Sequence, residues 1–271
     1  MTYSVRRAVA ALSVLVLCGC AMHDTVGHAQ PTGPVAVFSD DFTGPAGAPP
    51  GGPWRFDTGG GGWGNNEVQV YTDDPDNVSL DGAGHLAIVA RGEADGSNIT
   101  SARVTTKGTV EFTSGRAEAR IALPAGAGLH PAFWLLGSDV DRVGWPASGE
   151  IDVIETLNLA DEYHTGVHVP RQGSARGQEI SASGPAPFPL AGEFHTYWVE
   201  KTPERIVTGI DELTLFTVTP ADLAPESTWV FDGPVFLLLN LAVGGNWPGP
   251  PDLTTPNPST MLVDWVRVTA L

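Results

Sequence analysis

The sequence alternates short apolar runs with polar connectors, and this pattern predicts strands. The runs are rich in Val, Ile, Thr and aromatic residues, and Gly, Pro, Asp and Asn separate them. No segment keeps an apolar period of 3.6 residues, and a short helical turn is expected only at 220–223. Many short strands without helices indicate an all-β protein with a two-sheet antiparallel sandwich. The predicted strands are 36–38, 68–71, 86–90, 103–106, 116–123, 132–136, 151–155, 165–169, 195–200, 206–210, 235–241 and 261–269.

One predicted strand carries three carboxylates in an otherwise apolar, β-branched run. Glu150, Asp152 and Glu155 follow Trp145 in the sequence WPASGEIDVIE. Burying ionised carboxylates is costly, so a strand that does this is expected to serve a site. Alternation places Glu150 and Asp152 on one face and Glu155, at an odd offset, on the other. A β-bulge between Asp152 and Glu155 would return the third carboxylate to the face of the first two.

Such a bulge would make this strand suitable for glycoside hydrolysis. Retaining glycosidases place two carboxyl groups about 5–5.5 Å apart, one as nucleophile and the other as acid/base. The alternative is a solvated strand face that happens to be acidic.

Composition limits the domain organisation and the partners. Of the 271 residues, 42% are hydrophobic, which is enough for one large core, and neither an internal repeat nor a second domain is visible. We therefore expect a single domain over 36–271. The formal net charge of −17 argues against nucleic acid as a partner, because phosphate contacts need a basic surface.

The N-terminus has the pattern of an export signal. Arg6 and Arg7 precede an apolar run that ends near Gly19, and residues 1–20 are too short to span a membrane comfortably. The end of this segment resembles a bacterial lipoprotein signal in which Cys20 becomes lipidated; cleavage after Ala29 is the alternative. Residues 21–35 would then form a flexible tether. We expect an exported protein, either secreted or held at the cell surface by its lipid.

Two further patterns resemble cofactor or metal sites, but their context argues against both. Gly59, Gly61 and Gly64 have the spacing of a dinucleotide-binding motif, but a strand follows them in place of a helix. His164 and His168 would pair on a helix, whereas this segment has the pattern of strand and turn, which argues against a catalytic metal.

A set of longer motifs connects the chain to a known family. The motifs are WGNNE at 63–67, TSAR at 100–103, GRAEAR at 115–120, PAFW at 131–134, the carboxylate run, FHTY at 194–197, NLAVGGNWPG at 240–249 and VDWVRV at 263–268. With these motifs in order from about residue 38 to the C-terminus, the chain resembles family 16 of the glycoside hydrolases, specifically the bacterial laminarinase-like endo-β-1,3-glucanases. The resemblance implies a β-jelly-roll sandwich whose concave sheet forms a polysaccharide cleft.

The resemblance also implies the catalytic roles. Glu150 corresponds to the nucleophile, Glu155 to the general acid/base and Asp152 to the group between them. Negative charge on Glu150 and Asp152 is expected to raise the affinity of Glu155 for its proton. The chemistry would need no cofactor.

Further positions match the family's substrate-binding residues. Rings that stack on sugars are implied at Trp134, Trp145 and Trp247, although each could instead pack in the core or a loop. Polar groups that line the cleft are implied at Asn65, Arg103, His168 and Asn240, and Arg103 could alternatively pair with a carboxylate on the sheet.

A structural calcium ion is implied as well. Asp264 would supply a carboxylate, with Asp40 and Gly82 nearby in the aligned order, and these oxygens suit Ca²⁺. Alternatively, Asp264 caps or pairs on the surface.

The sequence limits the range of possible substrates but does not identify one. The Glu-x-Asp-x-x-Glu spacing resembles laminarinases, agarases and carrageenases, and the 14 Lys and Arg residues argue against a sulfated polymer. We expect hydrolysis of internal β-1,3 linkages in a neutral β-glucan by a monomer whose membrane contact, if any, is the lipid on Cys20. Transglycosylation, another β-linked polysaccharide such as a mixed-linkage glucan or a galactan, and non-catalytic glucan binding stay open. The chain departs from its relatives at 158–178, at Lys201, where Trp is frequent, and at Glu212.

Overall fold

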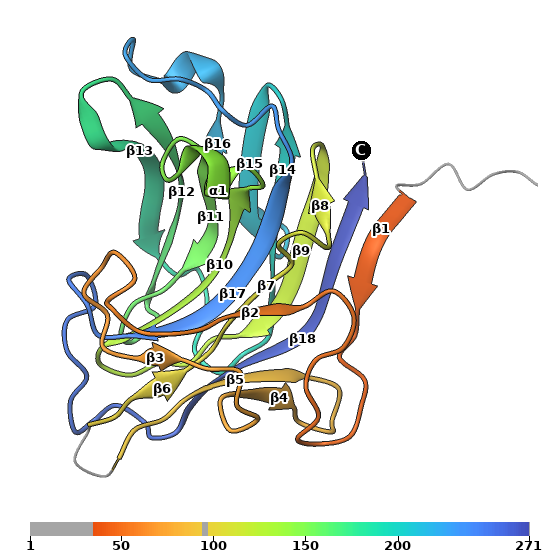
Figure 1. Cartoon of the computed structure of the whole chain (residues 1–271), viewed down its shortest axis with the longest axis vertical. Coiled ribbons are helices and arrows are strands. Elements are labelled where there is room, and N and C mark those ends of the chain that lie inside the picture. The colour runs from red at the N-terminus through yellow and green to blue at the C-terminus, as the bar shows by residue number, and fades with distance from the viewer. Residues whose placement is uncertain (1–34, 94–96, 271) are drawn as a thin grey trace, which may run out of the picture. The chain divides into compact units, whose positions relative to one another are not determined.

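Two antiparallel eight-stranded sheets make up most of the structure, which is a computed structural model describing residues 35–93 and 97–270 (Figure 1). The predicted export signal, Cys20 and the tether as far as residue 34 lie outside the described residues. Within the described ranges, no helix is long and apolar enough to cross a lipid bilayer.

The first sheet contains the predicted carboxylate strand, and we call it the carboxylate sheet. Its order is β13-β12-β11-β10-β17-β7-β2, with β8 paired to β17. The strands are β2 Arg55–Asp57, β7 Arg103–Thr105, β8 Glu111–Phe112, β10 Leu129–Gly137, β11 Glu150–Glu155, β12 Glu162–Arg171, β13 Ser174–Pro185 and β17 Val235–Val243.

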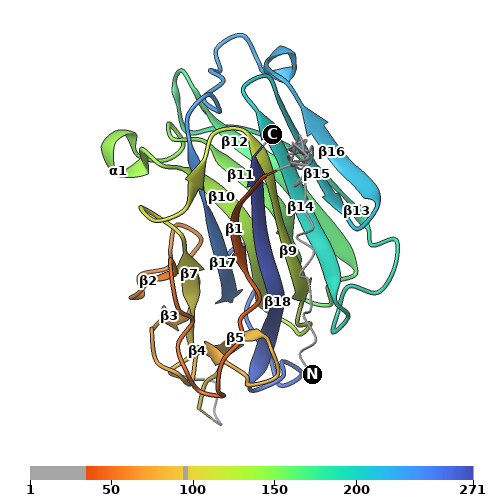
Figure 2. The ribbon, with the colours of Figure 1, turned by 90° about the vertical axis from the view of Figure 1, so that its right-hand side faces the viewer.

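The second sheet lies behind the first, and we call it the backing sheet. Its order is β16-β15-β14-β9-β18-β5-β4, with β1 paired to β18. Figure 2 shows β1, β18, β9 and β14 as one layer in front of β17, β10 and β11. The strands are β1 Val35–Asp40, β4 Val78–Leu80, β5 Leu86–Ala90, β9 Gly115–Ala122, β14 His195–Thr202, β15 Arg205–Ile210, β16 Leu213–Val218 and β18 Ser259–Ala270.

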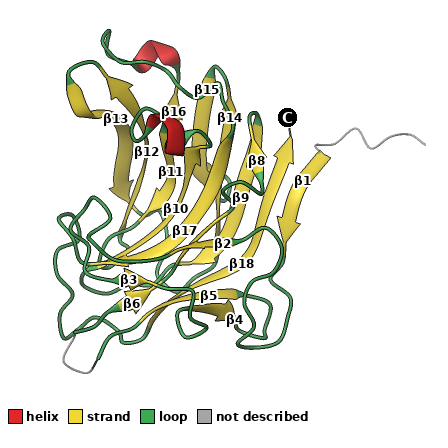
Figure 3. Cartoon of the chain, viewed as in Figure 1, coloured by secondary structure: helices red, strands yellow, loops and turns green. Residues whose placement is uncertain are grey.

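Among the described residues, little else is regular structure. β3 Val70–Tyr71 and β6 Thr100–Ser101 form a parallel pair, and Figure 3 shows helix only in α1 Val140–Val143 and the 3-10 turn η1 Pro220–Asp222. The turn coincides with the one predicted at 220–223. The all-β, two-sheet antiparallel sandwich expected from the sequence is confirmed.

The core forms where the two sheets face each other. In β9, Ala117, Ala119 and Ile121 are buried and alternate with outward-facing charged residues, as expected for a strand with one solvated face. By contrast, every residue of β17 is buried. Phe236 and Leu238 on this strand pack with Leu136 of the neighbouring β10 in a second apolar cluster.

Every predicted strand coincides with a strand of the structure, but β13 and β16 were missed, as were four short strands. The sequence of β13, SARGQEISASGP, has Ile180 as its one large apolar residue, and none of its residues is fully buried. This strand extends the sheet by pairing with β12 from Glu162↔Pro185 to Arg171↔Ser174. Residues 158–178, where the family resemblance is weakest, therefore include all of β12 and the start of β13.

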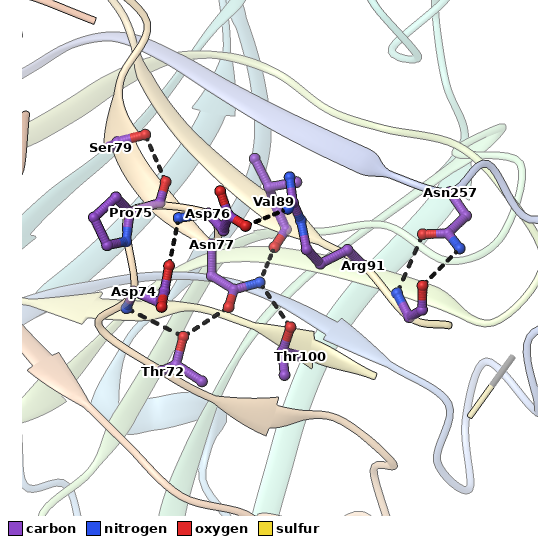
Figure 4. A network of polar contacts seen from close by, with 11 residues as sticks. Thr72, Asp74, Pro75, Asp76, Asn77, Ser79, Val89, Arg91, Thr100 and Asn257 are labelled. Carbon is purple, nitrogen blue, oxygen red and sulfur yellow. Dashed lines mark hydrogen bonds and ion pairs between the residues drawn. The ribbon is translucent and has the colours of Figure 1, made fainter. Parts of the chain in front are cut away.

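A polar network anchors the loop after β3 to the neighbouring strands (Figure 4). The buried amide of Asn77 accepts a hydrogen bond from the Thr72 hydroxyl at 2.7 Å. It donates to the Val89 carbonyl at 2.9 Å and to Thr100 Oγ1 at 3.0 Å. Because a buried amide needs partners for both its oxygen and its nitrogen, this network fixes the loop against β5 and β6.

A charged group is buried between the strands of the backing sheet and the loops near it. Lys201 on β14 has no exposed surface, and its Nζ donates to the Thr113 carbonyl at 2.6 Å and to the Gly233 carbonyl at 2.9 Å. Burial lowers the pKa of Lys201 to about 8, while the charge of Asp232 acts in the opposite direction. The departure noted in the sequence at Lys201 is therefore a buried cation held by two carbonyls.

Candidate active site

The predicted bulge lies on β11 between Asp152 and Glu155. Asp152 pairs with Gly166 and Glu155 with His164, so two residues of β11 oppose the single Thr165 of β12. The register also shifts on the other side of the strand, where β11 pairs with β10. The bulge expected from the spacing of the carboxylates is confirmed, and it reverses the side-chain parity between Asp152 and Glu155.

The beginning of β11 is fixed by a glycine. Gly149 has φ 76°, in the left-handed region, and a Cβ at this position would lie 2.8 Å from the ring of Phe231. A side chain there would be both strained and crowded. Gly149 thus determines where the chain enters the strand immediately before Glu150.

All three carboxylates line one cleft of about 880 Å³ on the carboxylate sheet. Asp152 is 5% exposed, while Glu150 and Glu155 are half-buried. Between Asp152 and Glu155, Val153 and Ile154 are both fully buried in the core. The bulge therefore lets consecutive apolar residues fill the core while the carboxylates on either side of them reach the cleft.

Two histidines contact the carboxylates. His168 Nε2 on β12 lies 3.7 Å from Glu150 Oε1 and 3.5 Å from Asp152 Oδ2. At the other end of the bulge, His130 Nε2 on β10 lies 2.7 Å from Glu155 Oε1. Glu155 thus has a histidine within close hydrogen-bond distance, whereas the histidine that Glu150 and Asp152 share is more distant.

The environment of Glu150 and Asp152 disfavours their ionised forms. Burial and the charge of Glu155 raise the pKa of Glu150 to about 8, although Arg103 and the Trp145 indole partly offset this. Burial and the charge of Glu150 raise the pKa of Asp152 well above its usual range. The cleft therefore holds protons at neutral pH, and these protons belong to the interacting set of carboxyl groups.

Two of the predicted sugar-stacking rings are open to solvent. Trp145 is 44% exposed and lies 5.7 Å from the ring of His168, and Trp247 is 46% exposed. Trp247 meets the rings of His130 and His164 edge-on, at centroid distances of 5.3 and 4.7 Å. These two indoles stand in the cleft and are not core rings.

The third ring, Trp134, is held at the floor of the cleft. Its Nε1 donates to Asn240 Oδ1 at 2.7 Å, and Asn240 Nδ2 donates to the Tyr71 hydroxyl at 3.2 Å. The Arg103 guanidinium stacks 4.5 Å from the Trp134 centroid and 5.0 Å from that of Trp63. This chain of contacts fixes one face and the polar edge of the Trp134 indole.

Each of the seven residues expected to bind substrate lines this same cleft: Asn65, Arg103, Trp134, Trp145, His168, Asn240 and Trp247. Arg103 also pairs with a carboxylate on the sheet, which was the alternative expected for it: its Nε lies 3.0 Å from Asp57 Oδ2. Their contacts with sugar stay predictions.

Several residues that line the cleft were missed from the sequence. They are Trp63, Glu67, Tyr71, His130, His164, Arg176 and Glu179. Glu67 lies inside a motif used for the resemblance, and His130 directly precedes another, so both could have been considered. Burial raises the pKa of Glu67, although Gln69 donates to its carboxylate at 2.6 Å. Arg176 and Glu179 are on β13, which was not predicted as a strand.

The expected calcium ligands have protein partners of their own. Asp40 accepts hydrogen bonds from the Phe42 amide at 2.9 Å and the Trp54 indole at 2.8 Å. Asp264 is paired with the Arg120 guanidinium, whose charge opposes a cation beside it. These side chains therefore do not form an oxygen cage, and calcium binding by Asp40, Gly82 and Asp264 stays a prediction.

Among residues 35–93 and 97–270, Glu150, Asp152 and His168 each have one atom that could bind a metal ion, and these three atoms lie within 4.8 Å of one another. They are part of the carboxylate cluster itself, and we assign them no metal.

Comparison with known proteins identifies the family. The family described as glycosyl hydrolases family 16 matches residues 63–267, which include the whole bulged strand. This chain belongs to family 16 of the glycoside hydrolases. A β-glucanase of Rhodothermus marinus is 37% identical over 97% of this chain and 94% of its own length.

Solved structures of family 16 enzymes share the fold. The endo-1,3-β-glucanase of Streptomyces sioyaensis has a TM-score of 0.78 and 35% identity, covering 89% of this chain and 98% of that one. The laminarinase of Rhodothermus marinus has a TM-score of 0.76 and 36% identity, covering 87% and 96%. The β-jelly-roll and the family inferred from the sequence are both confirmed.

Proposed function

We propose that this family 16 protein is a retaining endo-β-1,3-glucanase that cleaves internal linkages of a neutral, laminarin-like β-glucan. The observation that carries the proposal is the bulge in β11, which brings Glu150, Asp152 and Glu155 into one cleft. The β-glucanase and laminarinase relatives support the choice of substrate.

In the proposed mechanism, the two glutamates divide the chemistry. Glu155 donates its proton to the glycosidic oxygen while a carboxylate oxygen of Glu150 attacks the anomeric carbon, so the C–O bond to the leaving sugar breaks and an ester to Glu150 forms. Glu155, now a carboxylate, removes a proton from water, and the resulting hydroxyl displaces Glu150. Two displacements at the same carbon leave the anomeric configuration unchanged.

The proton distribution in the cleft differs from the expectation based on sequence, and Glu150, whose pKa burial raises to about 8, must lose its proton before it attacks. A negative Asp152 was expected to help Glu155 hold its proton, but burial favours the neutral form of Asp152. A neutral Asp152 places less negative charge beside Glu150, and this favours ionisation of the nucleophile. We propose that Asp152 acts as a proton-bearing neighbour of Glu150.

The charges of the cleft favour an uncharged polymer. Its acidic lining residues are Glu67, Glu150, Asp152, Glu155 and Glu179, and its arginines are Arg103 and Arg176. This lining offers a sulfated galactan two arginines with which to pair its many sulfate groups. A glucan chain could instead stack its apolar faces on Trp145 and Trp247.

The test is hydrolysis of laminarin by the wild type and Glu150→Gln, measured as reducing sugar. We expect the substitution to lower kcat by several orders of magnitude, because the amide cannot form the glycosyl ester. Glu162→Gln is a matched control, since Glu162 is exposed on β12 and does not line the cleft. Comparable activity in Glu150→Gln would contradict the nucleophile assignment. Agarose, carrageenan and mixed-linkage glucan in parallel reactions test the substrate, and product lengths at high acceptor concentration test transglycosylation.

We further propose that the protein is exported, with Cys20 as the lipid attachment site, and acts as a monomer. The N-terminal pattern of Arg6 and Arg7 before an apolar run supports export. Mass spectrometry of the mature N-terminus would distinguish lipidated Cys20 from cleavage after Ala29, and light scattering would give the oligomeric state.

A further inference from the structure

His130 is a buried titratable residue in the cleft that the proposed mechanism does not use. We infer that His130 is a positioning residue for Glu155: its Nε2–H binds Oε1 and leaves Oε2 as the oxygen that carries the catalytic proton. This inference rests on the proposed function, in which Glu155 is the acid/base.

The position of His130 follows from the register of the sheet. Ala132 on β10 pairs directly with Glu155 on β11, and His130, two residues away, is on the same face as Ala132. It is therefore the diagonal neighbour of Glu155, within reach of a long side chain. The 2.7 Å separation of Nε2 and Oε1 is that of a strong hydrogen bond.

The other nitrogen of the ring indicates the tautomer. His130 is 8% exposed, and its Nδ1 is buried without a hydrogen-bond partner among the described residues. An unpaired Nδ1 that bears a proton would be a buried orphan donor, whereas one without a proton is the less costly state. Neutral His130 therefore carries its proton on Nε2, the nitrogen that faces Glu155.

Charged and titratable groups around His130 favour donation to Glu155. Burial lowers its pKa, but the hydrogen bond and charge of Glu155, together with the charge of Glu67, outweigh burial and raise it. His164 on β12 is another titratable neighbour, and its ring also contacts that of Trp247. The Trp247 ring lies edge-on against both histidines, so it limits access of water to this pair.

This contact would act differently in the two half-reactions. While Glu155 is protonated on Oε2, His130 makes a hydrogen bond to a neutral carboxyl group. When that proton moves to the leaving oxygen, the same bond becomes charge-assisted and roughly twice as strong. His130 therefore stabilises the carboxylate that develops in the transition state and that later accepts a proton from water.

The experiment compares His130→Gln, which keeps a donor near Nε2 but does not titrate, with His130→Met, which has no donor. We measure kcat/KM against pH on a laminarin oligosaccharide. In His130→Met the carboxylate of Glu155 loses its donor, so the protonated form of Glu155 is favoured. The alkaline limb of kcat/KM should therefore move to higher pH by about one to two units, which is the shift equivalent to losing one hydrogen bond to a charged group. His130→Gln should keep the limb close to that of the wild type.

His85→Met is the matched control, since His85 Nδ1 contacts the Asp81 carboxylate at 2.7 Å outside the cleft, and it should not move the limb. Equal loss of activity at every pH in both His130 variants, with the limb unmoved, would show a merely structural role and overturn the inference. If His130→Met does not fold, a displaced limb in His130→Gln alone would overturn it.

A separate variant distinguishes failure of this inference from failure of the proposed function. On an aryl β-laminaribioside whose leaving group needs no proton, Glu155→Ala should be rescued by azide, which replaces water in attacking the glycosyl ester and yields a β-glycosyl azide. Rescue together with an unmoved limb in His130→Met would overturn the role of His130 alone. No rescue would overturn the assignment of Glu155, and the role of His130 with it.

Discussion

Replacing the buried Lys201 by methionine should change how stability depends on pH. The folded protein lowers the pKa of this lysine from 10.5 to about 8 because Nζ is buried. Between these two values the unfolded chain binds more protons than the folded protein, so the free energy of unfolding of the wild type rises with pH. Below about pH 8, both states are charged and the folded protein bears the full cost of burying the cation.

The magnitude follows from this shift. A displacement of about 2.5 units corresponds to roughly 3 kcal/mol, of which about 2.5 kcal/mol should be recovered by pH 10. Methionine removes this term but leaves the carbonyls of Thr113 and Gly233 without their donor, at a cost of about 1–3 kcal/mol. At pH 7 these effects nearly cancel, so Lys201→Met should have a stability close to that of the wild type. At pH 10 it should be less stable by about 2–3 kcal/mol.

Urea denaturation followed by tryptophan fluorescence at pH 7, 8, 9 and 10 measures this difference. Lys107→Met controls for the change in net charge, because Lys107 contacts solvent and pairs with Asp141. A constant difference between Lys201→Met and the wild type across this range would refute the reasoning, since no proton would then be linked to folding at Lys201.

Two further predictions concern the cleft. Asn240→Ala leaves the Trp134 indole N–H without its acceptor. We therefore expect the free energy of unfolding in urea titrations to fall by about 1–3 kcal/mol and the KM for laminarin to rise. If neither value changed, the role of this contact would be contradicted. Arg103 lowers and Glu179 raises the pKa of Glu150, so Arg103→Met should move the acidic limb of kcat/KM to higher pH and Glu179→Gln to lower pH. Limbs that move in the same direction would show that neither charge acts through Glu150.

The parts of the fold that could be predicted depend on local pattern. Strands such as β10 and β17 are apolar runs bounded by turn residues, so their positions were visible in the sequence. The bulge could be predicted because side-chain parity is a local property: Glu155 stands at an odd offset from Asp152. By contrast, β13 is a polar edge strand whose existence depends on pairing with β12.

The contacts within the site needed information that the sequence lacks. His130 and Glu155 are 25 residues apart in the chain, and their hydrogen bond depends on the register between β10 and β11. The pairing of Asp264 with Arg120 depends in the same way on the register between β18 and β9. The family resemblance predicted which residues line the cleft, but it did not predict which of them contact one another.

Trapping of the covalent intermediate tests the central claim most directly. A 2-deoxy-2-fluoro-β-laminaribiosyl fluoride slows both displacements but leaves a good leaving group, so the glycosyl-enzyme should accumulate. Mass spectrometry of the digested protein should then show one sugar adduct, on the peptide that contains the bulge, with Glu150 as the labelled residue. An adduct on Glu155 or Asp152, or turnover of laminarin with inversion and no adduct, would contradict the account.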